Sequence, residues 1–99
     1  MDSAADEMVA QSIEELALRL PHAHRLFRAA DHGGLGDCAG AIATVAARIG
    51  MTRLARVAGD VGRCCETHDL AALAATHCRM IRLGECSLRE IWDLQDLPV

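Results

Sequence analysis

Four runs of apolar residues, spaced alternately three and four positions apart, constrain the fold of this chain more than any other feature. The first two runs are Val9, Ile13, Leu16, Leu20, Ala23, Phe27 and Ala30, followed by Leu35, Cys38, Ile42, Val45 and Ile49. The third is Leu54, Val57, Val61 and Cys64, widened by Ala58 and Cys65, and the fourth is Leu70, Ala74, His77, Ile81, Gly84, Leu88 and Ile91. This spacing gathers apolar side chains on one face of a helix, whereas no stretch alternates as a strand does. The sequence therefore predicts an all-α fold of packed helices.

Short breaks with turn chemistry separate the runs. The segment DHGG (31–34) separates the first from the second, Gly50 ends the second, and THD (67–69) separates the third from the fourth. Asp31, Thr67 and Asp69 are the predicted N-caps of the helices that follow. The predicted helices span roughly residues 6–30, 33–49, 51–66 and 69–94.

Connections this short join antiparallel neighbours, so the sequence predicts one domain over residues 1–99, an up-down-up-down four-helix bundle. Pro21 lies inside the first apolar run. Because proline removes a helical hydrogen bond, we expect the first helix to kink there or to restart with proline in its first turn.

Composition and charge narrow the class of protein. With 52% hydrophobic and 24% charged residues, the chain has the balance of a globular domain and not of a disordered one. No apolar run approaches the length of a membrane span, and the acidic start MDSAADEMVA is unlike a secretory signal, so a cytoplasmic location is predicted. The net charge of −4 argues against nucleic acid as a partner. Five cysteines, an odd count without paired spacing, are predicted to be free thiols.

The second predicted helix has an outward face of small residues. The residues of this helix that do not belong to its apolar run and are predicted to point outward are Gly36, Gly40, Ala43, Thr44 and Ala47. Alanine is a good helix former, so its presence on this face is ordinary. Glycine in a helix, by contrast, costs about 1 kcal/mol relative to alanine. The two glycines leave two interpretations open: a bland solvated surface, or a face that a partner's backbone approaches closely.

Three segments resemble the turns and helix ends of one signalling family. They are AADHGGL (29–35), RIGMTRLARVAGDV (48–61) and ETHDLAAL (66–73). Together they are similar to the histidine-containing phosphotransfer domain, a four-helix module that relays phosphate between receiver domains in two-component signalling. The similarity covers roughly residues 10–92. It implies a four-helix bundle that binds receiver domains or histidine kinases.

The position of the family's phosphorylated histidine is occupied by glycine. Members of the family carry this histidine nine residues after the aspartate of the first turn and ten residues before the glycine of a closing aliphatic-glycine pair. Counted from Asp31 and from Gly50, both spacings lead to Gly40. The family's leucine, lysine and glycine two, three and four positions later correspond to Ile42, Ala43 and Thr44. Phosphotransfer needs an imidazole nucleophile and a nearby cation, and neither residue 40 nor residue 43 supplies one.

The resemblance therefore implies a pseudo-phosphotransfer protein that is not an enzyme, needs no cofactor or metal, and regulates by binding. Arg25, Arg28 and Arg48 would steer an acidic receiver toward it, although a solvated basic surface is the alternative interpretation. The predicted docking face consists of Gly36, Gly40, Ala43, Thr44, Ala47, Arg48, Arg25 and Arg28.

Other chemistry stays open at this point. A displaced histidine could carry phosphate, and His32 and His77 are the candidates, although His77 lies on an apolar run and is typical of a core histidine. Cys64, Cys65 and His68 could hold a metal, but they lack the paired CxxC spacing of structural zinc sites. The small-residue face could instead mediate self-association, giving a weak homodimer without a signalling partner.

Overall fold

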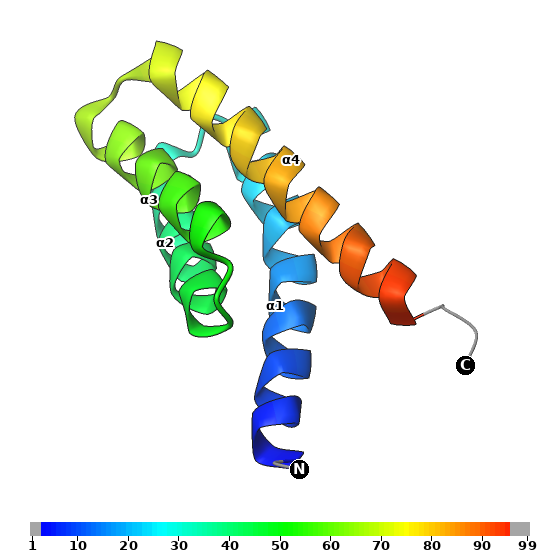
Figure 1. Ribbon diagram of the computed structural model, residues 1–99. Coiled ribbons are helices and arrows are strands. Elements are labelled where there is room, and N and C mark those ends of the chain that lie inside the picture. Colours follow the sequence, from blue (N-terminus) through cyan, green and yellow to red (C-terminus); the bar gives the residue numbers. More distant parts are fainter. Residues whose placement is uncertain (1–2, 96–99) are drawn as a thin grey trace.

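The structure, a computed structural model, describes residues 3–95 and consists there of helices joined by short turns (Figure 1). The helices are α1 (Ser3–Arg28), α2 (His32–Arg48), α3 (Thr52–Thr67) and α4 (Leu70–Gln95). Each helix packs against its neighbours in the chain, and α4 closes the ring against α1. The predicted all-α four-helix bundle is confirmed.

Each turn reverses the chain through one residue with a positive φ angle. These residues are Ala30 (φ 56°), Gly50 (φ 78°) and His68 (φ 56°). At the end of α1 the amide of Asp31 donates to the carbonyl of Leu26 (3.0 Å), and the amide of Ala30 donates to that of Phe27 (3.0 Å). This pair of bonds is the Schellman pattern that ends a helix. It explains why α1 stops at Arg28, two residues before the predicted end.

Side-chain caps start two of the helices. Oδ1 of Asp31 accepts from the amide of Gly34 (2.9 Å), and Oδ1 of Asp69 accepts from that of Ala72 (3.2 Å). Both predicted N-caps are therefore confirmed, and each satisfies an amide that has no partner within its helix. Thr67 is not a cap: it is the last residue of α3, and its hydroxyl donates to the carbonyl of Arg63 (3.0 Å).

Helix α1 runs unbroken through Pro21, so the helix does not restart there. Proline within a helix costs about 3 kcal/mol. Leu16, Leu20 and Ala23 on either side are almost fully buried, and the burial of such side chains offsets that cost.

The core is a single apolar cluster to which all the helices contribute. Its largest fully buried side chains are Leu16, Leu35, Ile42, Val61, Leu73 and Met80. In α4 the buried residues differ in part from the predicted run. Leu73 and Met80 lie in the core, whereas Leu70 in the first turn is 57% exposed and Ala74 is exposed. The reason is that α4 packs against both α3 and α1, so its buried stripe lies between these two contacts.

Gly84 sets the approach of α4 to α1. A Cβ atom at this buried position would lie 2.5 Å from Cδ1 of Leu20. Only a residue without a side chain lets the Leu20 methyl groups occupy this space, so the α1–α4 contact depends on glycine there.

The bundle is uneven in length. In Figure 1 the first turns of α1 and the last turns of α4 extend beyond the shorter α2–α3 hairpin. The described residues before position 12 in α1, and after position 88 in α4, are accordingly exposed or half-buried. Within residues 3–95, no helix has both the length and the apolar character needed to cross a lipid bilayer.

Candidate functional site

Gly40 lies at the middle of α2 with its backbone exposed to solvent. A Cβ atom built there would have no heavy atom of another element within 4 Å. One turn later, the Thr44 hydroxyl donates to the carbonyl of Gly40 (3.1 Å). A side chain at position 40 would therefore project freely from the helix, but glycine supplies none.

Two residues of the predicted docking face, Gly36 and Ala43, are half-buried and not fully exposed. A Cβ at Gly36 would lie 3.4 Å from Cβ of Cys65 in α3, and Ala43 is half-buried against the core. Residues 36, 39, 43 and 46 follow one edge of the helix, and this edge is buried or half-buried along its length. Gly36 thus serves the contact between α2 and α3.

The exposed face of α2 that remains is smaller and carries charges of both signs. It consists of Gly33, Asp37, Gly40, Thr44, Ala47 and Arg48. Asp37 was missed by the sequence reasoning, although it lies only three positions before Gly40 and so on the same side of the helix. Arg25 and Arg28 are exposed in the last turn of α1, as predicted, and neither forms an ion pair within the described residues.

His32 is the first residue of α2 and is half-buried. It borders a cavity of about 320 Å³ between the start of α2 and the end of α3, where Asp37, Glu66 and His68 also lie. Within residues 3–95, however, no three His, Cys, Asp or Glu side chains converge as metal ligands.

His77 is a core residue, 2% exposed, on the inner side of α4. Its ring stacks on Phe27 with centroids 4.3 Å apart and on His24 at 5.6 Å. Its Nε2 lies 3.3 Å from Nδ1 of His24, and its own Nδ1 is buried without a hydrogen-bond partner. Burial, and secondly the charge of His24, lower the pKa of His77 to about 4. Sequence reasoning missed the His24–His77 contact, because the two residues lie 53 positions apart.

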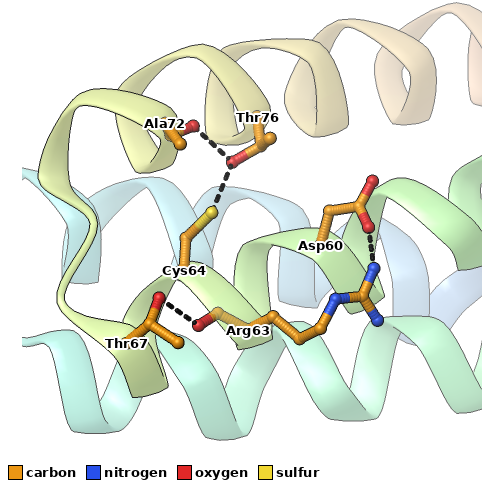
Figure 2. A network of polar contacts seen from close by, with 6 residues as sticks. All are labelled: Asp60, Arg63, Cys64, Thr67, Ala72 and Thr76. Carbon is orange, nitrogen blue, oxygen red and sulfur yellow. Dashed lines mark hydrogen bonds and ion pairs between the residues drawn. The ribbon is translucent and has the colours of Figure 1, made fainter.

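The cysteines are free thiols in the structure, as predicted. Cys38 and Cys65 are buried, and burial raises the pKa of both thiols. The Thr76 hydroxyl of α4 donates to the carbonyl of Ala72 (2.8 Å), and its oxygen lies 3.8 Å from the Cys64 sulfur (Figure 2). Because the thiolate is the reactive form of cysteine, the raised pKa makes Cys38 and Cys65 poor nucleophiles. Cys65 therefore serves packing, and Cys64 serves the contact between α3 and α4.

Comparison of the chain with known protein families, curated proteins and solved structures found no match.

Proposed function

We propose that this chain is a degenerate histidine-containing phosphotransfer protein that docks on a receiver domain or a histidine kinase and carries no phosphate. The observation that supports the proposal best is the placement of Gly40. It lies exposed at mid-length on a bundle helix, where the resembling family presents its phosphorylated histidine. The space around it is open, so a partner shaped to reach a side chain there meets only backbone.

The chemistry of the site supports binding without transfer. A glycine offers no nucleophile for a phosphoryl group, and the residue three positions later, Ala43, is uncharged and half-buried. His77 does not replace the missing histidine: it is 2% exposed and covered by Phe27, so a phosphoryl donor cannot reach it in the folded protein. The protein would act by occupancy, either blocking a receiver or holding it beside another protein.

Titration calorimetry of the purified protein against receiver domains and kinase domains of its own organism tests the docking proposal. The Gly40→Arg variant should lose binding because its side chain would project into the interface. Gly62→Arg is the matched control, since Gly62 on α3 also has open space around its Cβ position. The proposal fails if no receiver or kinase binds, or if both arginine variants bind like the unchanged protein.

Restoring the imidazole tests whether the scaffold still presents position 40 correctly. A Gly40→His variant, incubated with a phosphorylated receiver that binds the protein, should acquire acid-labile phosphate. The unchanged protein and Gly62→His should not. Phosphate on the unchanged protein would contradict the proposal directly, and analysis of His32→Ala would then show whether the displaced histidine carries it.

A further inference from the structure

The outer face of α1 carries a regular stripe of exposed residues whose charge changes sign along the helix. At spacings of three and four, the stripe consists of Gln11, Glu14, Leu18, Pro21, Arg25 and Arg28. Its one acidic residue, Glu14, lies in the first half, and its two arginines lie in the second half. At its centre Leu18 is 74% exposed, the most exposed of the large hydrophobic residues in the described chain.

Among residues 3–95, the charges of this stripe form no ion pair. The ion pairs among the described residues are Arg19–Glu15 and Arg63–Asp60, so Glu14, Arg25 and Arg28 are left without an opposite charge. A surface that is acidic at one end and basic at the other is complementary to a reversed copy of itself. Two-fold symmetry, the commonest symmetry of homodimers, requires this kind of self-complementary patch.

We propose that two copies of the chain associate through this stripe, with their α1 helices antiparallel about a two-fold axis between Leu18 and Pro21. Under this symmetry Glu14 faces Arg25 of the second copy, and Gln11 faces its Arg28. The helices overlap from residue 11 to residue 28, a length of about 27 Å. A parallel arrangement is excluded, because it would place Glu14 beside Glu14 and Arg25 beside Arg25.

The same geometry gives the exposed leucine an apolar environment. Leu18 of one copy faces Pro21 of the other, and Pro21 borders a cavity of about 240 Å³ in the seam between α1 and α4. Ala17, Leu88 and Trp92 line that cavity as well, and Trp92 is 46% exposed. Arg89 lines the cavity too, and tryptophan and arginine are among the residues that most often dominate binding at interfaces. The stripe shares Arg25 and Arg28 with the predicted docking face, but it includes no residue of α2.

Light scattering after size-exclusion chromatography, and sedimentation equilibrium, test the proposal on the full chain. We expect a dimer at roughly 100 µM that dissociates on dilution and is weakened by salt. Leu18→Asp should be a monomer throughout. Glu14→Arg and Arg25→Glu should each raise the dissociation constant about tenfold, because each replaces two opposite-charge contacts by like-charge contacts. The double variant restores the pairs with reversed sign, so its dissociation constant should return close to that of the unchanged protein.

All of the substituted side chains are exposed, so helical circular dichroism should show that the variants fold. Arg53→Glu, a charge reversal on the exposed start of α3, and Gly40→Arg should leave the dimer intact. A monomeric unchanged protein at roughly 100 µM would overturn the proposal. So would a dimer that survives Leu18→Asp, a double variant as weak as its single parents, or a dimer lost through Gly40→Arg.

Discussion

The buried imidazole of His77 should make the stability of this bundle depend on pH in a way that one substitution removes. In the unfolded chain a histidine has a pKa near 6.5, whereas burial lowers the pKa of His77 in the folded protein to about 4. Between these two values the unfolded chain binds a proton that the folded protein does not bind. The stability that the neutral imidazole provides is therefore complete above pH 6.5 and is lost as the pH falls toward 4.

The size of the effect follows from the pKa difference. Each unit corresponds to about 1.4 kcal/mol, so the free energy of unfolding should fall by about 3 kcal/mol across this window. Because small domains are typically stable by only about 5–15 kcal/mol, the loss should be easy to measure. The slope should approach 1.4 kcal/mol per pH unit in the middle of the window, and it should flatten below pH 4.

Urea unfolding followed by helical circular dichroism at several pH values between 7.5 and 4 measures the effect, with His77→Leu as the reference. Leucine has a similar volume, cannot titrate, and removes the buried Nδ1 that lacks a partner. All other titrating groups are common to both proteins, so the difference between the two curves isolates residue 77. Parallel curves for the unchanged protein and the variant would refute the reasoning.

Two further predictions concern packing and thiol chemistry. Gly84→Ala should lower the free energy of unfolding by about 1 kcal/mol, since overpacking against Leu20 costs about 1–3 kcal/mol and alanine returns about 1 kcal/mol of helix propensity. The matched control is Gly40→Ala, because a Cβ atom at position 40 meets open space; this variant should stabilise the protein by up to about 1 kcal/mol. Denaturant titrations measure both variants, and stabilisation by both would contradict the packing argument. A disulfide reagent should label the exposed Cys78 and Cys86 rapidly under native conditions, and the buried Cys38 and Cys65 only on unfolding. Equal labelling rates for all the thiols, measured by peptide mass spectrometry, would contradict the burial described here.

The helices and turns could be predicted because their determinants are local. Each helix begins and ends where nearby residues dictate: the spacing of apolar residues, an N-cap aspartate, or Gly50. These signals lie within about one helical turn of the boundary, so the order of residues alone predicts the boundaries to within a few positions. The same is true of the exposure of Gly40, since the apolar run of α2 places that position on the opposite side of the helix. What that face binds stays a prediction.

The orientation of each helix edge toward its neighbours was decided only by the tertiary structure. Gly36 packs against Cys65 of α3, and Ala43 packs against the core. Leu73 and Met80 enter the core in place of Leu70 and Ala74, and His24 meets His77 from 53 positions away. A helical repeat identifies a face but not which of its edges another helix will cover. That choice depends on the packing of all four helices at once, because each side chain at an edge is buried or exposed by residues far from it in the sequence.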